Sequence, residues 1–150
     1  LESGHANIYA AGKRPFHTII PAFLMRDDVP LMAFGVMGGY LQPQAHAQIV
    51  INMIDFGMNV QEAGDAARVV HSAASQPTGG KMTDGGTIYM EAGIPESVAE
   101  ELREMGHTVV HGKRRYVGSY GGYQAIWRDP KTGVYHGASE MRYDGVAAGY

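Results

Sequence analysis

The sequence predicts an α+β fold, because it contains both strand-like and helix-like patterns. Short apolar runs bounded by turn residues recur along the chain, and longer stretches place apolar residues at helical spacing. A chain of 150 residues with 45% apolar residues is long enough to bury a core. No internal repeat and no linker divides it, so we expect residues 1–150 to form one layered unit.

The first two expected strands form a hairpin. Residues 16–25 and 31–37 are apolar, and the turn formers Asp27 and Asp28 lie between them. Pro21 interrupts the first run, which suits an irregular strand because proline cannot donate a ladder hydrogen bond. Residues 1–12 are small and irregular, and they predict an incoming loop.

A buried helix is expected over residues 42–58. Its apolar residues recur at i, i+3, i+4, i+7 and i+11, namely Ala47, Val50, Ile51, Ile54 and Met58. Its polar stripe is narrow and consists of Gln44, Gln48, Asn52 and Asp55. Most of the helix circumference is therefore expected to be covered. Gly57 ends the pattern, and Asn59 with Glu62 forms a capping box that begins a second helix to about Arg68.

The second half predicts strand, helix and strand after a polar loop. Residues 72–86 are rich in glycine and polar residues, and they predict a surface loop. Residues 87–91 and 108–110 are strand-like, and residues 95–105 form an amphipathic helix that Gly106 terminates.

A second hairpin closes the chain. Residues 123–128 and 134–138 flank a turn that contains Pro130 and Gly133. Tyr150 ends a tail of small residues, and we expect it to pack rather than react.

Composition excludes several classes of function. The net charge of −3 gives no reason to expect nucleic acid or an anionic membrane as a partner. No apolar run reaches the roughly 18 residues that span a bilayer, and there is no cysteine. His107 and His111 have i, i+4 spacing, but Gly106 breaks the helix before them, so we expect no metal and no cofactor. A targeting signal would lie upstream, which leaves the compartment unassigned.

Gly38 and Gly39 stand where the second strand run meets the long helix. The simpler interpretation is a tight turn. The alternative is an anion site, because backbone without Cβ atoms lets successive N–H groups point at one oxygen and the helix N-terminus adds partial positive charge.

Four groups of residues together resemble a known family. They are Lys13-Arg14-Pro15, the pair Gly38-Gly39, the run Ile54-Asp55-Phe56-Gly57-Met58-Asn59 with Glu62-Ala63, and the closing Gly137-Ala138-Ser139-Glu140-Met141-Arg142-Tyr143-Asp144-Gly145 with Ala148-Gly149-Tyr150. In this combination the chain is similar to the gamma-glutamyltranspeptidase family over nearly its whole length. The resemblance implies part of an αββα N-terminal nucleophile hydrolase sandwich.

The resemblance also implies a mechanism. Enzymes of this family cut their own chain, and the freed N-terminal threonine attacks a γ-glutamyl amide with its α-amine as the base. Gly38 and Gly39 match the two glycines whose N–H groups receive the oxyanion. The threonine would lie upstream of Leu1, so residues 1–150 are expected to be the C-terminal portion of the small subunit and to be inactive alone. Expected partners are the upstream segment of the same precursor and a small-molecule γ-glutamyl substrate, with self-association through exposed strand edges as an option.

Two substrate-binding positions depart from the family pattern. Typical members carry paired serines that hold the donor carboxylate, and His17 and Thr18 stand there in this sequence. Both can still donate a hydrogen bond to a carboxylate. The simpler alternative for His17 is a strand residue whose polar groups are satisfied locally. Arg142 and Asp144 match charged positions of the family, and we expect an ion pair there to hold the last strand.

Three functions therefore stay open. The first is a gamma-glutamyltransferase or hydrolase that cleaves γ-glutamyl amides such as glutathione. The second is a glutaryl or cephalosporin-type acylase of the same family, which the replacement of two serines by His17 and Thr18 favours. The third is a non-catalytic module that binds an anion or a partner at Gly38 and Gly39.

Overall fold

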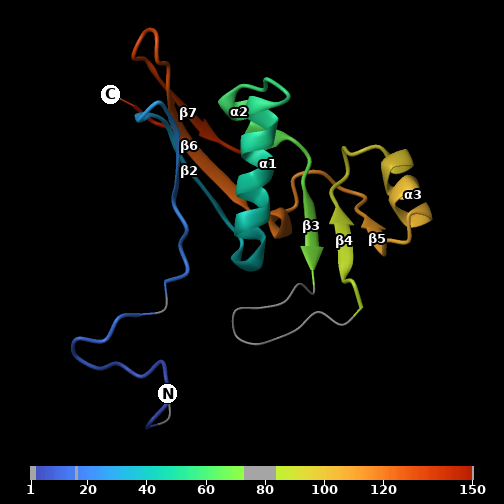
Figure 1. Ribbon diagram of the computed structural model, residues 1–150, viewed down its shortest axis with the longest axis horizontal. Coiled ribbons are helices and arrows are strands. Elements are labelled where there is room, and N and C mark those ends of the chain that lie inside the picture. The colour runs from blue at the N-terminus through green and yellow to red at the C-terminus, as the bar shows by residue number, and fades with distance from the viewer. Residues whose placement is uncertain (1–2, 16, 73–83, 150) are drawn as a thin grey trace.

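The strands form two sheets in a computed structural model that describes residues 3–15, 17–72 and 84–149 (Figure 1). The first is a four-stranded antiparallel sheet in the order β1-β2-β6-β7. Its strands are β1 (Ala22–Arg26), β2 (Val29–Met37), β6 (Gly122–Arg128) and β7 (Tyr135–Ser139). The second sheet has the order β3-β4-β5. Its strands are β3 (Val69–Ser72), β4 (Thr87–Met90) and β5 (Val109–His111).

Both predicted hairpins are confirmed. Asp27 and Asp28 join β1 to β2, and both have positive φ, which a tight two-residue hairpin turn requires. The first strand is shorter than predicted, since it begins at Ala22 and leaves residues 17–21 outside the sheet. Pro21 explains that limit, because its nitrogen has no hydrogen to donate to a partner strand.

In the described part of the chain, three α-helices accompany the sheets: α1 (Gln42–Ile54), α2 (Val60–Asp65) and α3 (Glu96–Glu104). The predicted capping box is present, with the Asn59 side chain accepting from the N–H groups of Gln61 and Glu62 at 2.9 Å. The N–H of Asn59 donates in return to Glu62 Oε2 at 2.8 Å. Helix α2 nevertheless ends at Asp65, because Ala66 is extended with ψ of 143°.

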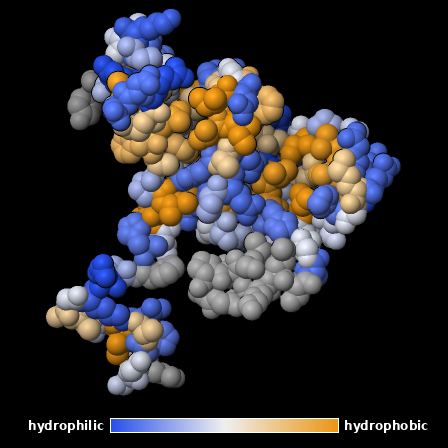
Figure 2. All heavy atoms as spheres, in the orientation of Figure 1, coloured by the Kyte–Doolittle hydropathy of each residue, from blue (hydrophilic) through white to orange (hydrophobic). Residues whose placement is uncertain are grey.

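The core lies between the β1-β2-β6-β7 sheet and helices α1 and α2. Alternate residues of β2 and β6 point into it, and Ala45 and Ile49 of α1 are fully buried against them. Tyr123 is also buried, and its hydroxyl donates to the Val60 carbonyl at 3.1 Å. Most of the circumference of α1 is covered, as predicted, because nine of its thirteen residues are buried or half-buried. The exposed residues form one stripe, which consists of Pro43, Ala47, Ile51 and Ile54, the last being 54% exposed. Figure 2 shows hydrophobic atoms at the surface around α1.

The predicted strand, helix and strand of the second half are present as β4, α3 and β5, with β4 and β5 parallel. Strand β3 was not predicted, and it pairs antiparallel with β4. The loop predicted over residues 72–86 falls largely on residues 73–83, which lie outside the described residues, as does Tyr150.

Two glutamines of α1 bond the outer edge of β3. Gln44 donates to the His71 carbonyl at 3.0 Å and accepts from the His71 N–H at 2.7 Å. Gln48 makes the same two bonds to Val69, both at 2.9 Å. Residues four apart on a helix rise about 6 Å, which nearly matches the distance of about 6.7 Å between alternate strand residues. The polar stripe of α1 thus acts as a partner for the edge of β3.

No helix in the described ranges is long and apolar enough to cross a bilayer. Among the same residues, no group of three or more His, Asp or Glu side chains is placed to hold a metal ion.

Candidate functional site

The pair of glycines forms a turn between β2 and α1. Gly38 has φ of 146° and Gly39 has φ of 62°, so both lie where side chains are disfavoured. The Gly38 carbonyl accepts from the N–H of Leu41 at 3.3 Å. Within the described ranges, no group accepts a hydrogen bond from the N–H of Gly38 or of Gly39. Two adjacent backbone donors are therefore available to a ligand.

Leu41 and Gly121 pack tightly against the glycine turn. Strand pairing sets Met37 opposite Gly122, which brings Gly121 against the turn. A Cβ atom on Gly38 would meet Leu41 Cδ2 at 3.0 Å and Gly121 Cα at 3.4 Å. A Cβ atom on Gly121 would meet the Met37 carbonyl oxygen at 2.6 Å. Neither glycine has room for a side chain.

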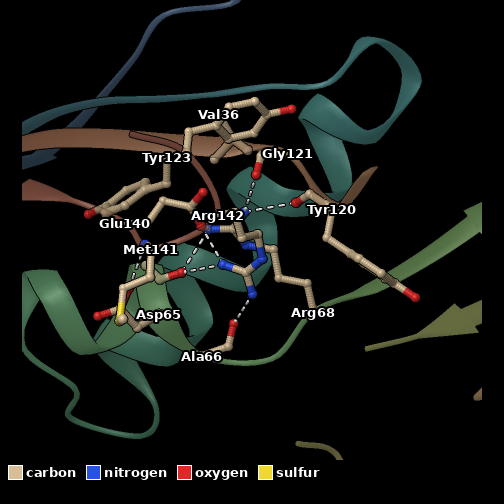
Figure 3. Close-up of polar contacts among 12 residues, drawn as sticks. Val36, Asp65, Ala66, Arg68, Tyr120, Gly121, Tyr123, Glu140, Met141 and Arg142 are labelled. Atoms are coloured by element: carbon tan, nitrogen blue, oxygen red, sulfur yellow. Dashed lines mark hydrogen bonds and ion pairs between the residues drawn. The ribbon is translucent and has the colours of Figure 1, made fainter. Parts of the chain in front are cut away.

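A cluster of buried charges holds the backbone behind this turn (Figure 3). Arg68 is 1% exposed, and its Nη1 donates to the Tyr120 carbonyl at 2.8 Å and to the Gly121 carbonyl at 3.4 Å. Its Nη2 lies 3.0 Å from Glu140 Oε2. Burial and the neighbouring Arg142 lower the pKa of Arg68 to about 10, so it remains a cation at neutral pH.

Arg142 completes the cluster at the end of β7. Its guanidinium forms ion pairs with Glu91 and Glu140, and its Nη2 donates to the Ala66 carbonyl at 2.8 Å. Burial alone would lower the pKa of Arg142, but the hydrogen bonds to the two carboxylates outweigh burial and raise it. Two positive and two negative side chains thus compensate one another and join α2, β4 and β7.

The predicted ion pair between Arg142 and Asp144 is wrong. Asp144 is exposed, and within the residues that the structure covers it forms no ion pair. The partners of Arg142 are Glu140, two residues away, and Glu91, 51 residues away, and no local pattern identified this pair of partners. One signal was available in the sequence, because Arg68 and Glu91 each stand next to a short apolar run. In the structure both are among the largest fully buried side chains.

His46 of α1 fixes the end of β2 from the opposite side. Its Nε2 accepts a hydrogen bond from the Val36 N–H at 3.1 Å, and its ring centroid lies 5.0 Å from that of Phe34. Only a neutral imidazole has a nitrogen that can accept this bond. Burial lowers the pKa of His46 below its ordinary 6.5, which favours the neutral form.

This bond predicts a loss of stability in mild acid. Because the folded pKa of His46 is lower than the unfolded one, the unfolded state binds more protons below pH 6.5. The contribution of His46 is therefore complete above that pH and is lost as the pH falls below it. In a His46→Gln variant the side-chain oxygen accepts the same N–H without titrating. The difference in thermal midpoint between wild type and variant should change across this range, whereas parallel curves would contradict the assignment.

A pocket of about 630 Å³ opens beside the turn. It is lined by Thr18, Ile19, Ile20, Pro21, Phe34, Gly35, Val36, Met37, Gly38, Gly39, Gln42, Gly122, Gln124 and Tyr143. The structure therefore brings three of the four predicted site residues, Thr18, Gly38 and Gly39, to one pocket. His17 is exposed and does not line it.

Among the described residues, the lining contains no charged side chain. A carboxylate that entered this pocket would meet the neutral polar groups of Thr18, Gln42 and Gln124 and the backbone N–H groups of the turn. Gln42, Gln124 and Tyr143 were not predicted, because nothing in their local sequence separates them from ordinary helix, strand and tail residues. The pocket can accept a developing negative charge without any fixed cation of this chain.

Comparison with known proteins identifies the family. The profile described as Gamma-glutamyltranspeptidase matches residues 1–150. The crystal structure of a cephalosporin acylase from Bacillus halodurans superposes with a TM-score of 0.75 at 41% identity, over 99% of this chain and 25% of that one. A gamma-glutamyltranspeptidase from Pseudomonas nitroreducens, complexed with L-DON, gives a TM-score of 0.68 at 29% identity, over 100% of this chain and 71% of that one.

A curated relative shows the same likeness in sequence. The glutathione hydrolase-like YwrD proenzyme of Bacillus subtilis is 30% identical over 152 residues, covering 99% of this chain and 27% of the relative. The chain thus spans about a quarter of the length of the curated relatives that it matches. The neighbouring structures also confirm the predicted α+β fold of the N-terminal nucleophile hydrolase class. On the match of the family profile over its whole length, this chain belongs to the gamma-glutamyltranspeptidase family.

Proposed function

We propose that the protein containing this chain is an acyl-transfer enzyme that cleaves γ-glutamyl amides such as glutathione. One observation carries the proposal. Two adjacent N–H groups, on Gly38 and Gly39, have no acceptor among the described residues, and both glycines line a pocket that Thr18 also lines. Attack on an amide carbonyl converts its oxygen to an oxyanion, and one well-placed donor stabilises that transition state by about 3–4 kcal/mol.

The nucleophile in this proposal comes from outside the chain. The chain covers 71% of one solved gamma-glutamyltranspeptidase chain but only 27% of a curated proenzyme. This difference supports an assignment of residues 1–150 to the smaller processed subunit, and the resemblance of residues 137–150 to the family's closing motif supports its C-terminal portion. The upstream part of the precursor then supplies the N-terminal threonine, whose amine takes the hydroxyl proton as the oxygen attacks. The chain alone is accordingly inactive.

A glutaryl-type acylase is the second candidate. The family's paired serines are replaced by His17 and Thr18, and a cephalosporin acylase is 41% identical to this chain. Glutaryl and γ-glutamyl groups have the same carbon chain and differ only in the α-amino group. Since the described lining of the pocket has no carboxylate to pair with an ammonium, residues outside this lining decide between the two.

Hydrolysis of two anilides by the full-length protein tests this function. We expect γ-glutamyl anilide to be cleaved with the larger kcat/KM. Equal or faster turnover of glutaryl anilide would replace the transferase assignment by the acylase. No turnover of either substrate would favour a binding module. A variant with alanine in place of the proposed N-terminal threonine serves as the background control.

A further inference from the structure

The side-chain amide of Gln42 connects the two halves of the pocket. Gln42 is the first residue of α1 and is half-buried beside the glycine turn. Its Nε2 donates to the Thr18 carbonyl at 3.0 Å and to the Gly39 carbonyl at 3.2 Å. Both acceptors are carbonyl oxygens, so only the NH₂ group of the amide can face them. Each of its two hydrogens therefore has an acceptor.

This connection matters because residues 17–21 have little else to hold them. They lie outside the sheet, which begins at Ala22. In the residues that the structure describes, the Gln42 bond is the one hydrogen bond between residues 17–21 and the rest of the chain. The preceding arm, residues 3–15, extends away from the body (Figures 1 and 2). The position of Thr18 relative to Gly39 therefore depends on Gln42.

We propose that Gln42 is a positioning residue that sets which acyl chain length the enzyme accepts. The inference rests on the proposed function, in which Gly38 and Gly39 hold the reacting carbonyl and Thr18 lies at the carboxylate end of the acyl group. A chain with a carboxylate at its far end fits only when its length matches the separation of these two sites. Gln42 bonds both sites and so fixes that separation. The substrate class is an acyl group of one length with a terminal carboxylate.

Selectivity for the length of the acyl chain distinguishes a positioning role of Gln42 from a role in stability alone. Full-length wild type and Gln42→Leu are compared on succinyl, glutaryl and adipyl anilides, which differ by one methylene each. Wild type should prefer one length. Loss of the two amide bonds should lower kcat/KM for that length by roughly tenfold and for the other lengths by less. Gln44→Leu is the matched control, because it removes comparable amide bonds to His71 outside the pocket. That control should leave the ratio among the three substrates unchanged.

An isosteric variant gives a second, independent measurement. Gln42→Glu places a carboxylate against two carbonyl oxygens, which repels when ionised and can donate one hydrogen bond when protonated. The ratio of kcat/KM for Gln42→Glu to that for Gln42→Leu should therefore rise as the pH falls from about 8 to about 5. The ratio cancels the pH dependence common to both variants. If Gln42→Leu does not fold, the ratio of kcat/KM for Gln42→Glu to that for wild type is followed over the same pH range and tests the role of Gln42.

The outcomes separate the two proposals. Wild type that cleaves none of the substrates, γ-glutamyl anilide included, overturns the proposed function and this inference with it. Active wild type without length preference, or with a preference that both Gln42 variants retain, overturns the role of Gln42 alone. Smaller differences in kcat/KM among the three chain lengths in the Gln42 variants, with unchanged differences in Gln44→Leu, support the positioning role of Gln42.

Discussion

Replacing Gly38 by alanine is expected to lower kcat of the full-length enzyme by about 10²–10³-fold, the effect of losing one oxyanion donor. Its φ of 146° is a conformation that side-chain-bearing residues rarely adopt. The added methyl would also contact Leu41 and the backbone of Gly121 at 3.0 and 3.4 Å. The turn must then shift, and both N–H groups turn away from the substrate oxygen. Steady-state kinetics on γ-glutamyl anilide measure the loss.

Gly39→Ala is the matched variant in the same turn. Its φ of 62° lies in the left-handed helical region, which alanine reaches at a cost of about 1–2 kcal/mol, and no heavy atom lies within 4 Å of the added methyl. The turn can therefore persist, and the loss of kcat should be clearly smaller than for Gly38→Ala. Equal losses in the two variants would mean that substitution in this turn is harmful for reasons other than geometry.

Arg142→Leu is expected to cause the largest loss of stability. The change leaves Glu91 and Glu140 buried with one cation fewer, and breaking a buried ion pair costs about 3–5 kcal/mol. In a full-length protein about four times as long as this chain, like the relatives it matches, the thermal midpoint should fall by roughly 3–4 °C. The Ala66 carbonyl also loses its donor, and the Gly64 carbonyl keeps only the hydrogen bond from Arg68. Thermal unfolding of the full-length protein measures the effect.

Arg103→Leu is the control, because it removes an exposed ion pair where Arg142→Leu removes buried ones. Arg103 and Glu96 form an ion pair at 2.9 Å, but their side chains are 39% and 52% exposed. Exposed pairs contribute about 0–1 kcal/mol, so the midpoint should barely move. Similar shifts for Arg103→Leu and Arg142→Leu would show that the buried cluster does not carry the stability assigned to it.

The elements that sequence reasoning found are those with local causes. The turn at Asp27 and Asp28, the capping box at Asn59 and the glycine pair each depend on a few neighbouring residues. Strand β3 was missed, because its hydrogen bonds come from β4 and from side chains of α1, which no local pattern reveals. The exposed stripe of α1 was not identified for a similar reason, since several faces of the helix carry apolar residues and only packing selects the one that faces away from the core.

The site was half predictable for the same physical reason. Gly38 and Gly39 stand out because their conformations exclude most side chains. The role of Gln42 cannot be recognised in the sequence, because its hydrogen-bond acceptors are backbone carbonyls, which every residue has. The cluster of Arg68, Glu91, Glu140 and Arg142 draws on separate segments, and no spacing rule connects them.

Gln44 and Gln48 of α1 affect whether further strands can pair with the edge of the β3-β4-β5 sheet. The edge strand β3 would ordinarily offer the N–H and C=O groups of Val69 and His71 to any passing strand. Gln44 and Gln48 already occupy these groups. A strand from another molecule therefore finds no template there, and the helix protects the chain from adding strands at this border. The residues that protect the outer edge of β3 against aggregation therefore lie in helix α1 and not in β3 itself.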